Sequence, residues 1–180
     1  MNLQLTKKLA DKLKVDMSPI DISKADDIDN YHCNLIQFGR EYGILITNDK
    51  TLYSFYLHGF RTKEFKDFEY IFKELIFKLL LDSGLEQYQF EKILNSMETI
   101  TYTKTSNRSV TASMTDMKHF IENSIYSGDD LFTINRKINT IPYKKNDYKY
   151  AIKLFDEVIN ILIAFIFYYI LYFFLKFKIL

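Results

Sequence analysis

The chain has 180 residues, a length that fits one folded domain with an appendage. Its 24 Lys and Arg against 23 Asp and Glu give a formal net charge of +1, so no overall field draws the protein to nucleic acid or lipid headgroups. The lone cysteine, Cys33, excludes an intrachain disulfide, and the first ten residues lack the apolar stretch of a signal peptide, so we expect the domain to face a reducing cytosol.

The first sixty residues are mainly strand-like. Runs rich in Ile, Leu, Phe and Tyr are separated by short polar segments, a pattern typical of antiparallel hairpins. We expect a strand at residues 3–5, a short helix at 6–14, a surface loop at 16–30, and strands at 32–38, 43–48 and 51–58.

The next eighty residues are mainly helical. Apolar positions repeat every three or four residues, with charged residues on the other side. We expect helices at residues 64–82 and 85–95, a strand at 98–104, a helix that ends near Gly128, and another that ends at Pro142. Residues 1–157 are therefore predicted to form one α+β domain, with a small antiparallel sheet covered by helices on one face.

The composition changes abruptly after Glu157. Residues 158–175 carry no charge, and a helix of that length spans about 27 Å, close to the hydrocarbon thickness of a bilayer. This C-terminal hydrophobic helix predicts a membrane anchor over residues 158–180, with the lysines on both sides favouring a cytoplasmic domain. Two alternatives stay open: a helix packed in the core or an oligomer, and a tail produced by a frameshift. With either alternative the protein would be cytoplasmic.

Residues 104–117 are unusually polar. Ser113 and Asp116 match a capping box, which predicts a helix that begins there. The residues just before it are Lys104, Ser106, Asn107, Arg108 and Ser109, and an anion or a protein partner could bind them at the helix N-terminus. The alternative is that Arg108 is a structural tie to a neighbouring carboxylate or carbonyl.

Four sequence blocks carry a resemblance to a known family: TKKL, Tyr31 to Leu35, TNDKTL and KTSNRSVTASMTD, followed by Tyr148 and Lys149. In this order they resemble a family of small bacterial proteins, domain of unknown function 6933, over about residues 3–157. The chain departs from the family pattern at Thr111-Ala112, where Leu-Gly is expected, and at Thr115, where Asn is expected. The resemblance implies a fold unit without an established activity, and the family lacks the apolar tail.

Few residues suggest catalysis. His32 and Asn34 would share one face of a strand, and they could form a polar cluster with Asn48 and Arg108 if the strands adjoin. No cysteine and histidine spacing typical of zinc is present, so neither a metal site nor a cofactor is predicted.

The sequence therefore favours a non-enzymatic interaction domain with an unknown protein partner, tethered to the membrane through residues 158–175. One alternative is a nucleic-acid or nucleotide-binding module that uses Lys104 and Arg108 on phosphate. Another alternative is an enzyme of unknown reaction that uses His32, Asn34 and Arg108.

Overall fold

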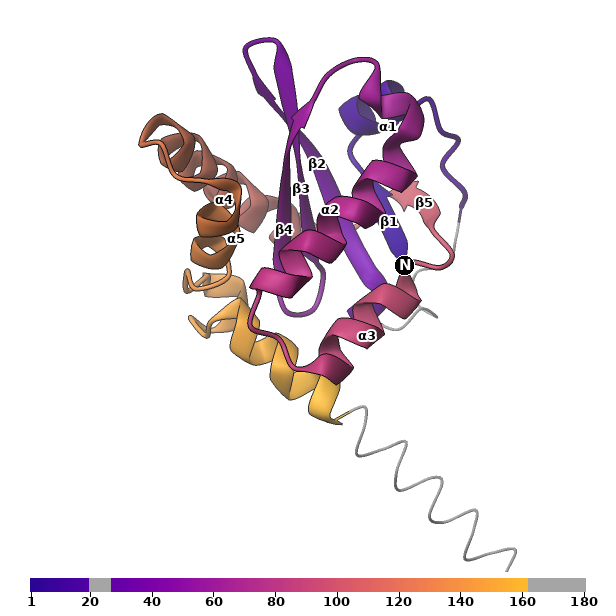
Figure 1. Cartoon of the computed structure of the whole chain (residues 1–180). Coiled ribbons are helices and arrows are strands. Elements are labelled where there is room, and N and C mark those ends of the chain that lie inside the picture. Colours follow the sequence, from indigo (N-terminus) through magenta and orange to yellow (C-terminus); the bar gives the residue numbers. More distant parts are fainter. Residues whose placement is uncertain (20–26, 162–180) are drawn as a thin grey trace, which may run out of the picture.

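The computed structural model describes residues 1–19 and 27–161 (Figure 1). It contains a five-stranded mixed sheet with the strand order β4-β3-β2-β1-β5. The strands are β1 (Asn2–Leu5), β2 (Asn30–Phe38), β3 (Glu41–Asn48), β4 (Ser54–Phe60) and β5 (Thr101–Lys104). Long helices accompany this sheet, and the predicted α+β class is confirmed.

Helices fill most of the other described residues. The α-helices are α1 (Lys7–Leu13), α2 (Phe68–Asp82), α3 (Gln87–Ser96), α4 (Arg108–Tyr126), α5 (Leu131–Ile138) and a helix over residues 151–161. Three short 3-10 helices are η2 (Asp27–Asp29), η3 (Glu64–Asp67) and η4 (Lys144–Asn146).

The sheet is mixed, whereas the sequence predicted a wholly antiparallel one. Strands β2, β3 and β4 form the predicted antiparallel hairpins. Strand β1 pairs in parallel with both β2 and β5. The difference follows from the connections, because α1 leads from β1 to β2 and the segment with α2 and α3 leads to β5, and a helical crossover returns the chain in the same direction.

Helices cover both faces of the sheet, not the single face that the sequence predicted. Alternate residues of each strand point to opposite sides, so Ile44 and Ile46 pack with α1, α2 and α3, while Leu45 between them packs with α4 and α5. Figure 1 shows α2 and α3 in front of the sheet, with α4 and α5 beside β4. The structure therefore has three layers and two apolar cores.

The outer edge of β4 is covered by two asparagines of α5. Asn139 accepts from the backbone N–H of Ser54 at 2.7 Å and donates to its carbonyl at 2.8 Å. Asn135, one helical turn earlier, forms the same pair of bonds with Tyr56 at 2.8 and 2.9 Å. These side-chain amides take the place of a neighbouring strand, which protects an edge that would otherwise be open to strand addition.

The helix over residues 151–161 packs on the core beside the start of α3. Ala151, Phe155 and Ile159 are buried, and the ring of Phe155 stacks on Tyr53 with centroids 4.7 Å apart. Asp156 accepts hydrogen bonds from the hydroxyl of Tyr88 and the amide of Gln89. The helix thus has one apolar side and one polar side.

The predicted transmembrane helix is contradicted. In the part of the chain that the structure describes, no helix is both long and apolar enough to cross a bilayer. The first four residues of the predicted span, 158–161, are the last described residues of the helix that packs on the core. Residues 162–175 of that span, and the tail to residue 180, lie outside the described residues, and the domain boundary after Glu157 stays a prediction.

We expect Asn139→Ala to destabilise the fold by about 2–4 kcal/mol, because it leaves a buried N–H and a buried carbonyl of β4 without partners. Urea unfolding followed by circular dichroism measures this change. Asn123→Ala on α4 is the matched control, because Asn123 is exposed. Equal unfolding midpoints for the two variants would contradict a structural role of the α5 amides.

Candidate functional site

The helix α4 begins earlier than its sequence predicted. Asn107 is the N-cap, and its side-chain oxygen accepts from the backbone N–H groups of Ser109 at 3.0 Å and Val110 at 3.3 Å. Ser113 and Asp116, the predicted cap, therefore lie within the helix, and this assignment is corrected. Both Asn107 and Ser113 suit a cap, and burial of Val110 makes the earlier start the stable one.

Three Ser and Thr hydroxyls of this region have local structural partners. Thr111 donates to the carbonyl of Asn107 at 3.0 Å, Ser113 to that of Ser109 at 3.2 Å, and Thr115 to that of Thr111 at 3.1 Å. Such bonds to the residue four positions earlier are common for Ser and Thr in helices. They account for much of the polar composition that made this stretch stand out.

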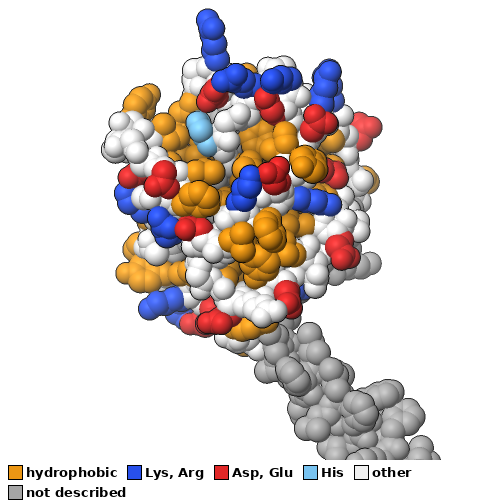
Figure 2. Space-filling view, viewed as in Figure 1, with side chains coloured by type: hydrophobic (Ala, Val, Ile, Leu, Met, Phe, Trp, Pro, Cys, Tyr) orange, Lys and Arg blue, Asp and Glu red, His pale blue; other side chains and the backbone are white. Residues whose placement is uncertain are grey.

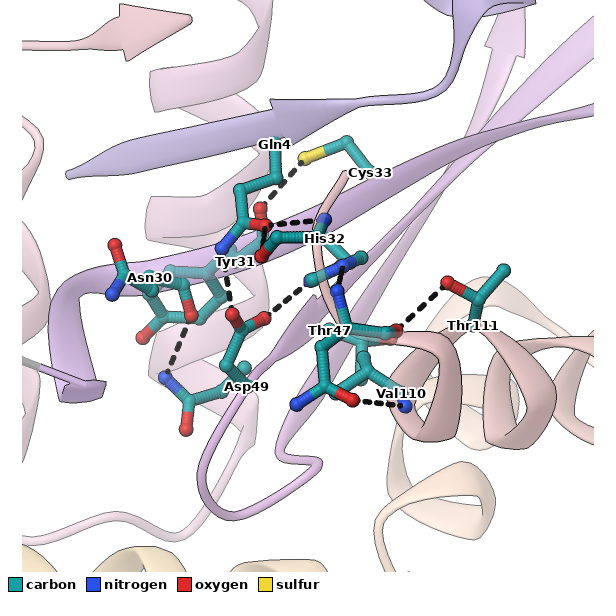
Figure 3. Close-up of polar contacts among 12 residues, drawn as sticks. Gln4, Asn30, Tyr31, His32, Cys33, Thr47, Asp49, Val110 and Thr111 are labelled. Atoms are coloured by element: carbon teal, nitrogen blue, oxygen red, sulfur yellow. Dashed lines mark hydrogen bonds and ion pairs between the residues drawn. The ribbon is translucent and has the colours of Figure 1, made fainter. Parts of the chain in front are cut away.

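The buried side chain of His32 forms a hydrogen bond to the loop that precedes α4 (Figure 3). His32 on β2 is 0% exposed, and its Nε2 accepts from the backbone N–H of Asn107 at 3.1 Å. Its Nδ1 lies 2.5 Å from Oδ1 of Asp49, which follows the end of β3. This arrangement assigns the proton to Nδ1 and leaves Nε2 as the acceptor.

Gln4 on β1 adds a second connection to the same loop. Its amide nitrogen donates to Oδ2 of Asp49 at 2.6 Å. Its amide oxygen accepts from the backbone N–H of Ser106 at 3.2 Å and from the Ser106 hydroxyl at 2.8 Å. Gln4 and His32 are 0% exposed and the Asp49 side chain is 13% exposed, and we call these three residues the buried network. Together they fix Ser106 and Asn107.

The buried network positions the loop and leaves His32 little scope for proton transfer. Both ring nitrogens have protein partners, and the ring is enclosed. A general base needs a free lone pair within reach of a substrate. Cys33, the next residue, is also enclosed, and burial raises the pKa of its thiol, which disfavours the nucleophilic thiolate.

The predicted polar cluster of His32, Asn34 and Asn48 does not assemble around one point. Asn48 pairs with Tyr31 across the β2–β3 ladder, so it faces the opposite side of the sheet from His32. Its amide donates to the carbonyls of Ile28 and Asn30, and its oxygen accepts from the N–H and hydroxyl of Thr51. Asn48 therefore organises the turn after β3, while Asn34 shares the face of His32.

Arg108 lies on the surface next to the loop that the buried network fixes. Lys104 ends β5 opposite Leu5, so it is on the other face of the sheet from Gln4 and His32. Lys104 and Arg108 are exposed, and neither forms an ion pair with a carboxylate among the described residues. Arg108 lines a surface hollow of about 450 Å³ with Asn107, Thr111 and Thr115. The structural tie that the sequence offered for Arg108 is not among the interactions of the described residues.

Most backbone N–H groups of the loop are already used. Ser106 donates to Gln4, Asn107 to His32, and Ser109 and Val110 to the Asn107 side chain. A bound anion would therefore rely on side chains, unlike the anion in a glycine-rich phosphate loop. No cluster of three or more His, Cys, Asp or Glu side chains suited to a metal ion occurs in residues 1–19 and 27–161.

Sequence reasoning missed Gln4 and Asp49. Gln4 is a polar residue between Leu3 and Leu5 on a buried strand, which is a signal that a partner is needed. Asp49 gives no such signal, because only the register of β2 against β3 brings it beside His32.

These features define a small three-layer α+β domain with a surface loop that buried side chains hold in place. A family model described as Domain of unknown function (DUF6933) matches residues 2–154. The chain therefore belongs to the DUF6933 family, as its sequence blocks predicted. Comparisons with curated proteins and with solved structures find no match.

We expect His32→Leu to destabilise the fold by about 2–4 kcal/mol, because it leaves the Asn107 N–H and one oxygen of Asp49 without partners. The more specific readout is hydrogen exchange, which should become faster at the amides of Ser106 and Asn107 than at those of β3. His119→Leu is the control, since the His119 side chain on α4 is 68% exposed. Unchanged exchange at Asn107 would contradict the positioning role of His32.

Proposed function

We propose that the domain is a non-enzymatic interaction module, and that its contact surface is the loop from Lys104 to Arg108 with the first turns of α4. One observation carries the proposal: Arg108, an exposed cation without an ion pair among the described residues, directly follows the two residues that the buried network fixes. A loop fixed before binding loses little conformational entropy when it binds. A cation at a hydroxyl-rich hollow suits an acidic segment of a partner protein.

The phosphate-binding alternative uses the same surface but has weaker support. Its usual source of affinity is a set of free amides at a helix N-terminus, and here the cap and the buried network use most of them. The enzymatic alternative needs His32 as a base or nucleophile, and the geometry gives this residue a positioning role instead. The interaction module is therefore the function that the geometry supports best.

The proposal is tested with a photo-crosslinking amino acid placed at Thr111, inside the hollow, or at Asn123, exposed further along α4. We expect a discrete protein adduct from position 111 in cells and none from position 123. Arg108→Glu should reduce the adduct at least tenfold, since reversing a charge that contacts an acidic partner replaces attraction by repulsion. A nuclease-sensitive adduct would favour the phosphate alternative, and the absence of any adduct specific to position 111 would contradict the proposal.

A further inference from the structure

A second cationic surface lies on the other side of the sheet, at the end of the molecule where α1 lies. A cleft of about 590 Å³ is bounded by α1, the β2–β3 hairpin and η3. Figure 2 shows Lys and Arg side chains along the upper edge of the face that it draws, near the position of α1 in Figure 1. The volume lies within the range typical of small-molecule sites, about 300–1,000 Å³.

Four lysines line this cleft against a single carboxylate. They are Lys8, Lys12, Lys14 and Lys66, and the acid is Asp11. Four positive charges less one negative give a local charge of +3, on a chain with a formal net charge of +1. Among the described residues, Lys8, Lys14 and Lys66 form no ion pair with a carboxylate. Grouped like charges of this kind favour an anionic ligand.

The floor of the cleft is apolar and aromatic. Leu13 and Leu35 are half-buried, and Phe65 is 5% exposed. The ring of Tyr42 packs edge-on to Phe65 with centroids 5.6 Å apart. Lys12 lies over the Tyr42 ring at 4.4 Å and donates to its hydroxyl at 3.0 Å, which fixes both side chains. A cationic rim above such a floor suits an anion with an organic body.

Lys14 adopts a backbone conformation that is usually occupied by glycine. It ends α1 with φ 55° and ψ 41°, in the left-handed region, and its N–H donates to the carbonyl of Ala10 at 2.8 Å. Glycine is the usual residue at this helix-ending position, because it adopts the conformation without steric cost. A lysine there places an ammonium group at the cleft at the expense of local stability.

We propose that this cleft binds a small phosphorylated organic molecule with a flat body, such as a mononucleotide. Lys8, Lys14 and Lys66 contact the phosphates, and Tyr42 with the apolar floor contacts the body. The proposal concerns a small molecule and not a nucleic acid, since the cationic surface is one cleft on a nearly neutral chain. It is independent of the interaction surface around Arg108, which lies on the opposite face of the sheet.

The first experiment is titration calorimetry of the full chain with four probes at low salt. The probes are ATP, inorganic pyrophosphate, adenosine and a single-stranded DNA hexamer. We expect saturable binding of ATP, at least tenfold weaker binding of pyrophosphate, and still weaker binding of adenosine and of the hexamer. Failure of ATP to bind, equal affinities for ATP and pyrophosphate, or tighter binding of the hexamer would overturn the proposal.

Variants then locate the site. Lys8→Gln and Lys66→Gln should each weaken ATP binding at least fivefold, whereas Lys7→Gln should not change it, because Lys7 is exposed on the same helix and does not line the cleft. Lys14→Gly should weaken binding while the unfolding midpoint is kept or raised. Arg108→Ala should leave ATP binding unchanged, and a loss of binding in this variant or in Lys7→Gln would overturn the assignment to the cleft.

Discussion

The pair formed by His32 and Asp49 is the interaction on which the rest of this architecture depends. It joins the middle of the sheet to the turn after β3, and through Nε2 it joins both to the start of α4. Gln4 adds β1 to the same set, so residues about a hundred positions apart meet at one partly buried site. Because buried polar groups are costly without partners, all of these elements must be in place together.

This network also explains why α4 takes one position on the sheet. Along most of its length α4 packs through Val110, Met114, Met117 and Ile121 against Ile36, Leu45 and Tyr56, and apolar contacts of this kind tolerate small shifts. Hydrogen bonds to the start of the helix do not tolerate such shifts, because they need defined distances and directions. The apolar core therefore drives docking of the helix, and the buried network fixes where it begins.

The sequence predicted the local secondary structure but not the contacts that depend on which strands pair. The strands and the amphipathic helices follow from periodicity, and the shared face of His32 and Asn34 follows from alternation. The parallel pairing of β1 depends on which strands adjoin, which no short stretch of sequence contains. The same holds for Asp49 beside His32, and for the lysine cleft, which combines residues of α1 with Lys66 from a distant turn.

The two cationic surfaces share one strand. Along β2, His32 faces α4 and holds the interaction loop, while Leu35 and Gln37 face the cleft beside α1. A slip of one residue in the pairing of β2 would exchange these faces and abolish both surfaces. His32 opposes such a slip, because its ring nitrogens meet Asp49 and the N–H of Asn107 only in this register. Both surfaces therefore depend on a register that one buried histidine helps to define.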